Sequence, residues 1–142
     1  MFGYCVWLQL CSTHNLNNII KDFHTFFNTE KYLAHVTVDY NINKFSKDNY
    51  IVDDLIKDGE IYFTENNNFF SAQQDFFFKS NPIKLLHISL AYKVNKPFTE
   101  GEKLYLKSLK IDEEIKKKDL QINLWNCDSK YTQNWKLVEV AL

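Results

Sequence analysis

The chain contains no arginine, and lysine supplies all 17 of its basic residues. Against 18 acidic residues this gives a formal net charge of −1. A protein that coats nucleic acid needs a strongly basic surface field, so this charge balance argues against that class of function. A small anionic ligand, held by a few local hydrogen-bond donors, remains compatible with it. We therefore expect no stable nucleic-acid partner.

Cysteine is scarce, and Cys5, Cys11 and Cys127 have none of the spacings typical of metal sites. Their odd number, together with the lack of a recognisable signal peptide, favours reduced thiols in a cytosolic or nuclear compartment. We expect a cytoplasmic protein. The chain also lacks any apolar run approaching the roughly 18 residues that a membrane-spanning helix requires. No membrane partner is expected.

The length and composition are those of a folded protein. The 142 residues, 45% of them hydrophobic and 16% aromatic, are enough for one domain over residues 1–142, either compact or divided into two small lobes. We expect a monomer.

A six-residue pattern occurs twice. Residues 35–40 read His-Val-Thr-Val-Asp-Tyr, and residues 87–92 read His-Ile-Ser-Leu-Ala-Tyr. Both copies lie in segments whose aliphatic and β-branched residues favour strands. Alternate residues of a strand share a face, so His35 should lie beside Thr37, and His87 beside Ser89. One such pair arises often by chance. Two copies on similar strands supply an imidazole and a hydroxyl twice, a set of groups suited to handling one phosphate.

The rest of the sequence predicts helices and short strands. An apolar stripe predicts a helix over 15–29, and Thr99 with Glu102 forms a capping box for a helix ending near residue 109. A further short helix is predicted at 47–57, ending at Gly59. Strands are predicted at 3–10, 32–42, 60–63, 75–79, 85–92, 119–127 and 134–141, with Pro82 closing the unit before the second motif and a turn at 128–132 joining the last two strands.

These motifs resemble the signature of the two-histidine (2H) phosphoesterase superfamily, a pair of H-x-[ST] motifs on strands of two related lobes. The opening Tyr-Cys-Val-Trp-Leu (4–8) resembles the first strand of its plant and fungal cyclic phosphodiesterases. The segments 124–128 and 134–140 resemble their closing hairpin. The resemblance implies an α+β fold with two lobes of antiparallel sheet, pseudo-two-fold symmetry and a central groove. Family members usually have a further helix before the second motif; its absence here predicts a more open groove.

The resemblance also implies a metal-independent phosphodiesterase. Histidine titrates nearest neutral pH, so His35 and His87 can serve as base and acid, in an order that the sequence leaves open. Thr37 and Ser89 would donate hydrogen bonds to the non-bridging phosphate oxygens. No cofactor is expected. A metal is not expected either, because the motifs lack the usual ligand partners, although Asp39 should share the face of His35.

Four aromatic residues are candidates for substrate binding. Tyr92 matches an aromatic that follows the second motif in the cyclic phosphodiesterases, while Trp7 is either a stacking surface or a core residue. Trp125 or Trp135 is expected to hold a second base. The implied substrate is a small nucleotide: a cyclic dinucleotide, a 2′–5′ oligoadenylate, a 2′,3′-cyclic or ADP-ribose cyclic phosphate, or an RNA terminus. Some viral and phage members of the superfamily destroy immune messengers, which would locate a viral protein in the host cytoplasm. The alternative is a non-catalytic module of the same fold that binds a nucleotide or an RNA end.

Overall fold

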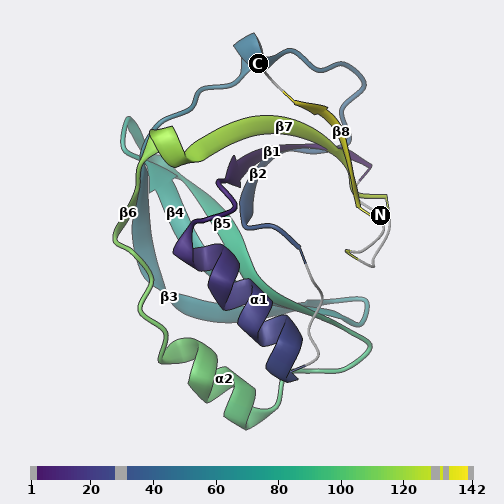
Figure 1. Cartoon of the computed structure of the whole chain (residues 1–142), viewed down its shortest axis with the longest axis vertical. Helices are drawn as coiled ribbons and strands as arrows, with labels where there is room; N and C mark the ends of the chain where they lie inside the picture. The colour runs from purple at the N-terminus through teal and green to yellow at the C-terminus, as the bar shows by residue number, and fades with distance from the viewer. Residues whose placement is uncertain (1–2, 28–31, 129–131, 133–134, 141–142) are drawn as a thin grey trace.

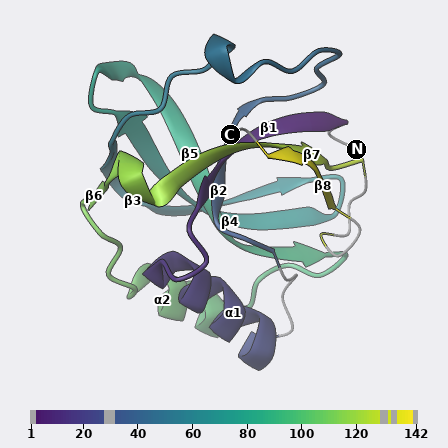
Figure 2. The ribbon, with the colours of Figure 1, turned by 45° about the horizontal axis from the view of Figure 1, so that its top comes forward.

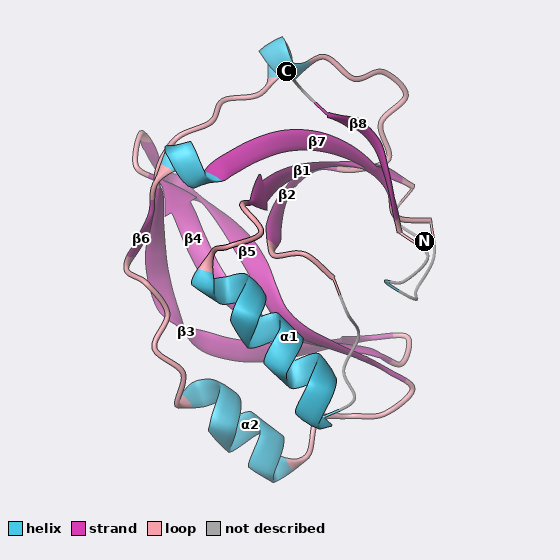
Figure 3. Cartoon of the chain, in the orientation of Figure 1, coloured by secondary structure: helices cyan, strands magenta, loops and turns pink. Residues whose placement is uncertain are grey.

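The computed structural model of the chain describes residues 3–27, 32–128, 132 and 135–140. Within these residues the fold is mixed α and β, with eight strands in one antiparallel sheet and two α-helices (Figures 1 and 3). In chain order the elements are β1 (Tyr4–Leu10), α1 (Asn15–Phe27), β2 (His35–Asp39), β3 (Leu55–Asn66), β4 (Phe69–Phe78), β5 (Asn81–Val94), α2 (Glu100–Lys107), β6 (Glu114–Ile115), β7 (Leu120–Asn126) and β8 (Lys136–Val140). Single turns of 3₁₀ helix occur at Lys47–Asn49 and Lys117–Asp119.

The two motif strands are neighbours at the centre of the sheet. The strand order is β6-β3-β4-β5-β2-β1-β7-β8, so β2 and β5 each carry three further strands on their outer side. Within the described chain, one residue pair, Val36 with Ile88, joins β2 to β5. By contrast, β4 pairs with β5 from Phe69 to Phe78. The two motif strands are therefore paired only at Val36 and Ile88, and they diverge from each other before and after that pair.

Both helices cover the same face of the sheet (Figures 1 and 2). The apolar stripe of α1 buries Leu16, Ile20 and Phe23 to 2% exposure or less. These side chains belong to one core cluster with the apolar residues of the central strands, among them Val6, Leu8, Val36, Ile88 and Leu90. Full burial of each such side chain stabilises the fold by roughly 1.5–3 kcal/mol. The histidines and hydroxyl residues of the motifs point to the opposite face.

The helix predictions have three different outcomes. The first helix is confirmed over Asn15–Phe27, and residues 28 and 29 of its predicted range lie outside the described part. The second is confirmed with its capping box, in which the Glu102 amide donates to Thr99 Oγ1 and the Thr99 amide to Glu102 Oε1. The helix predicted at 47–57 is wrong, because Lys47–Asn49 form a single 3₁₀ turn and β3 begins at Leu55.

The middle of the chain forms a longer hairpin than predicted. The strands expected at 60–63 and 75–79 are parts of β3 and β4, which turn at Asn67 and Asn68, with φ of 50° and 62°. Asparagine tolerates this left-handed conformation, so the pair suits a tight turn. Pro82 does not close a unit, since it lies inside β5 where residues 82–84 have no partner on β4. A proline is accommodated there because no ladder hydrogen bond is needed.

The outer strands agree with the sequence to within a few residues. The strand predicted at 3–10 is β1, and those at 119–127 and 134–141 are β7 and β8. Residues 134 and 141, and most of the turn predicted at 128–132, lie outside the described part. Among the described helices, neither is long and apolar enough to cross a bilayer.

Candidate functional site

Each motif strand has a β-bulge directly after its hydroxyl residue. On β2, Thr37 and Asp39 lie opposite Trp7 and Val6, which are consecutive on β1, so Val38 is left without a partner. A bulge of one residue reverses the alternation of side chains beyond it. Asp39 is therefore turned to the face of Val6, and Tyr40 is turned to the face of the motif histidine.

The second motif repeats this irregularity at the same position. Ser89 and Ala91 lie opposite Gln73 and Ala72 of β4, so Leu90 is the residue without a partner. Tyr92 then lies opposite Ser71 and shares the face of His87 and Ser89. Strict alternation would have turned Tyr92 toward the helices.

The expectation that Asp39 shares the face of His35 is wrong. Its carboxylate accepts hydrogen bonds from the Tyr50 hydroxyl at 3.0 Å and from the Tyr40 amide at 2.9 Å. This removes the carboxylate that would have joined a metal site at the first motif. Across the residues that the structure describes, no group of three or more His, Cys, Asp or Glu side chains is arranged to hold a metal ion.

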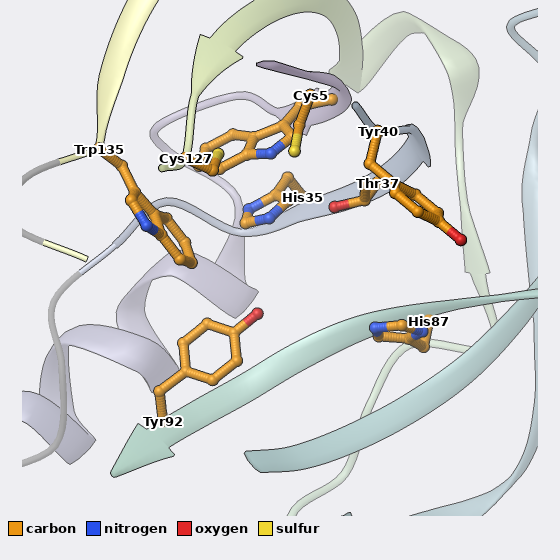
Figure 4. Close-up of a pocket in the computed structure, with 9 residues that line it drawn as sticks. Cys5, His35, Thr37, Tyr40, His87, Tyr92, Cys127 and Trp135 are labelled. Carbon is orange, nitrogen blue, oxygen red and sulfur yellow. The ribbon is translucent and has the colours of Figure 1, made fainter. Parts of the chain in front are cut away.

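The two histidines face one cavity of about 360 Å³ on the side of the sheet opposite the helices (Figure 4). Its walls come from both motif strands, from β1 and from the residues on either side of the β7–β8 connection. They are formed by Cys5, Trp7, His35, Thr37, Tyr40, His87, Tyr92, Cys127 and Trp135. Figure 4 shows the hydroxyls of Thr37 and Tyr92 directed toward the side of the cavity where His35 lies.

The ring of His35 is buried and held in one orientation. It is 5% exposed and stacks on the indole of Trp7, with 3.4 Å between ring centroids and 5° between the planes. Its Nδ1 lies 2.6 Å from the carbonyl oxygen of Leu33. A carbonyl only accepts hydrogen bonds, so Nδ1 carries the proton and Nε2 of the neutral ring carries the free lone pair.

Burial also sets the charge of His35. Desolvation lowers its pKa to about 3; the bond to Leu33 opposes this shift, and the charge of His87 adds to it. The imidazole is therefore neutral at neutral pH, with Nε2 available to accept a proton.

Of the two alternatives for Trp7, a stacking surface or a core residue, the structure favours the core residue. One face of its indole is covered by His35, and Trp125 stacks at 4.3 Å and 17° from the β7 side. Trp7 is 1% exposed and belongs to the second apolar cluster, so its core reading is the correct one. Trp125 lies behind Trp7, donates its indole N–H to Gln9 and is not part of the cavity wall. Trp135 does line the cavity.

His87 has a different environment from His35. Its side chain is exposed, and it lies directly opposite Asp75 in the β4–β5 register. Partial desolvation lowers the pKa of His87, while the charge of Asp75 acts in the opposite direction. The Tyr62 hydroxyl donates to Asp75 Oδ1 at 2.6 Å, which fixes the carboxylate beside the imidazole. The two histidines, equivalent in the sequence pattern, thus differ in burial and in their partners.

The two hydroxyl residues also differ. Thr37 lines the cavity, whereas Ser89 is 5% exposed and is not part of its wall. The Ser89 carbonyl oxygen accepts a hydrogen bond from Tyr32 at 2.8 Å. Burial raises the pKa of Tyr92 to about 12, and a hydrogen bond with the Ser89 side chain opposes this shift. The hydroxyl of Ser89 therefore contacts the Tyr92 phenol, which itself lines the cavity.

Several residues of this site are not predicted by the sequence patterns. Tyr40 has a detectable signal, because each six-residue pattern ends in tyrosine and Tyr40 is the counterpart of Tyr92. Cys5 and Cys127 are buried side by side in the cavity wall, and a hydrogen bond between them and burial raise the pKa of the Cys127 thiol. That thiol stays protonated and serves as apolar wall. Asp75 had no signal, since its position depends on a cross-strand register.

Comparison of the chain with protein-family models and with curated proteins finds no match in either.

Proposed function

We propose that the protein is a metal-independent phosphodiesterase that hydrolyses a cyclic or 2′-linked nucleotide phosphodiester. The observation that carries this proposal is the pair of motif histidines, which face one cavity from adjacent strands but in different environments. Acid–base chemistry on one substrate needs two titratable groups whose surroundings favour opposite protonation states. Burial lowers the pKa of both His35 and His87, but only His87 faces a carboxylate, Asp75, whose charge opposes that shift and favours the protonated ring.

We assign His35 as the general base. Its Nε2 has a free lone pair because Nδ1 is committed to the Leu33 carbonyl, and burial keeps the ring neutral. A bound phosphate brings a negative charge beside the ring, which raises its proton affinity at the moment when a proton is transferred. The stacking of Trp7 holds the ring plane during this transfer.

We assign His87 as the corresponding general acid. Desolvation lowers its pKa, but its ring is more exposed than that of His35 and lies opposite Asp75, whose charge favours the protonated form. In the reaction, a water oxygen attacks phosphorus while its proton passes to Nε2 of His35. The bond from phosphorus to the leaving oxygen breaks, and that oxygen takes a proton from His87. Thr37 and Tyr92 donate hydrogen bonds to the non-bridging oxygens, and Ser89 acts through Tyr92.

The arrangement of the strands supports a two-lobed organisation of the superfamily type. The sheet divides into four strands on each side of the β2–β5 contact, and each motif strand has its bulge at the same position. A groove between two such halves fits a small nucleotide. Cyclic dinucleotides, 2′–5′ oligoadenylates and 2′,3′-cyclic or ADP-ribose cyclic phosphates all present the required diester, and removal of an immune messenger is the biological role that the first two suggest.

The test is hydrolysis of 2′,3′-cyclic AMP, a 2′–5′ diadenylate and a cyclic dinucleotide, with products separated by chromatography. We expect turnover of at least one of them, and a fall in rate of about 10² to 10⁴ in both His35→Asn and His87→Ala. Asparagine at position 35 keeps a donor for Leu33, so the variant should fold, and circular dichroism checks this. His24→Ala, at an exposed position on α1, is the matched control and should retain the parental rate. Near-full activity in His87→Ala would show that the assignment is wrong.

A further inference from the structure

Tyr40 is the exposed aromatic residue at the mouth of the cavity. It lines the same space as the two histidines, yet its side chain is 66% exposed. In Figure 4 it lies beside Thr37, on the side of the cavity from which His87 approaches. Its position follows from the bulge at Val38, since regular alternation would have turned the ring toward the helices.

The other aromatic rings of the cavity are already in contact with each other. Trp7 is covered by His35 and Trp125. Tyr92 lies 4.5 Å from the Tyr32 ring and 4.8 Å from the Phe69 ring, and is 8% exposed. Trp135 is also 8% exposed and meets Trp7, His35 and Tyr92 through edge contacts. None of these three rings offers an open face for a planar ligand.

Tyr40 differs from them, because its ring contacts no other aromatic ring within the described chain. Its backbone is nevertheless fixed, since the Tyr40 amide donates to Asp39 Oδ1 at 2.9 Å and that carboxylate is held by Tyr50. The ring is therefore attached to a positioned backbone while its faces remain available. Nucleobases stack on aromatic faces of this kind largely independently of sequence.

We propose that Tyr40 is a base-binding subsite, on which the nucleobase adjoining the scissile phosphate stacks while the phosphate lies between His35 and His87. The inference rests on the proposed function for the identity of the phosphate site, and it names the substrate class more closely. The preferred ligand is a nucleotide diester with its base present, rather than a diester of the same charge that lacks one. The exposed tyrosine thus replaces Trp7 as the stacking residue.

The experiment is calorimetric titration of 2′,3′-cyclic AMP and of a 2′–5′ diadenylate into the His87→Ala protein, whose lowered rate should keep the ligand intact during the titration. Tyr40→Leu and Tyr40→Phe are introduced into the same background. Stacking on an aromatic face corresponds to a change of about 5- to 150-fold in affinity on loss of the ring. We expect Tyr40→Leu to raise the Kd by this factor for at least one ligand, and Tyr40→Phe to change it by less than about twofold.

Two controls make the result specific. The abasic analogue of 2′,3′-cyclic AMP, with hydrogen in place of adenine, should bind the Tyr40→Leu protein as well as it binds its parent. Tyr4→Leu removes a tyrosine that is 47% exposed on β1 but lies outside the cavity, and should leave every Kd unchanged. Equal Kd values in the parent and Tyr40→Leu proteins, or no binding of either nucleotide, would overturn the inference. Tyr40-dependent binding without hydrolysis by the wild-type protein would leave the subsite standing and reject the proposed phosphodiesterase.

Discussion

The burial of His35 should make the protein measurably sensitive to mild acid. Its pKa is about 3 in the folded state, against 6.5 for the unperturbed side chain. At pH 7 the ring is neutral in the folded protein and mostly neutral in the unfolded chain, so its cost is only about 0.2 kcal/mol. Between pH 6.5 and pH 3 the unfolded chain binds a proton that the folded protein cannot, so stability is lost as the pH falls through this window.

The size of the effect follows from the two pKa values. Each pH unit inside the window costs about 1.4 kcal/mol of unfolding free energy. At pH 5, which lies 6.5 − 5 = 1.5 units below the unfolded pKa, the cost attributable to His35 is about 2 kcal/mol. Because the side chain is only 5% exposed, solvent screening does not reduce this figure substantially.

The assay is urea unfolding, followed by tryptophan fluorescence at pH 7 and at pH 5, for the wild-type protein and His35→Asn. The asparagine cannot be protonated, while His14, His24 and His87 are common to both proteins. We expect the wild type to lose about 2 kcal/mol more than the variant between the two pH values. Losses that agree to within about 0.5 kcal/mol would refute the conclusion that His35 is buried in its neutral form.

Two further predictions concern the reaction. Asp75→Asn removes the charge that raises the pKa of His87, so the basic limb of the kcat/KM profile should move to lower pH; an unmoved limb would contradict the role of this carboxylate. Since the two limbs belong to a coupled pair, the shift of the profile is the measured quantity, not a pKa of either ring. Activity should also survive excess EDTA, and a complete loss that one divalent ion restores would reject the metal-independent mechanism.

The sequence was sufficient for features encoded by local patterns. Alternation identified β1 and both motif strands, the apolar stripe identified α1, and the Thr99 capping box identified α2. These signals are visible within one element because each depends on the spacing of neighbouring residues.

Features that depend on distant partners were missed. The segment predicted as a helix at 47–57 contains Asp53 and Asp54, whose carboxylates accept hydrogen bonds from the amides of Ser80 and Lys117. Those contacts join this segment to distant parts of the chain in a non-helical conformation, and no local pattern encodes them. The β2 bulge could not be predicted either. One unpaired residue exchanges the faces to which Asp39 and Tyr40 point, and the composition of the strand carries no sign of it.

The order of the strands has a consequence for how the protein folds. β3, β4 and β5 follow one another in the chain and pair as neighbours. β1, by contrast, pairs with the much later strand β7, and the Trp125 indole donates to the side chain of Gln9, 116 positions earlier. Contacts of such high sequence separation form late and slow the folding reaction. Trp7 therefore gains Trp125, the support behind the His35 ring, only when the strand that carries Trp125 has docked. The strands around His87 therefore pair with near neighbours in the sequence, whereas the support behind His35 depends on distant ones, and we expect the His35 side of the cavity to form last.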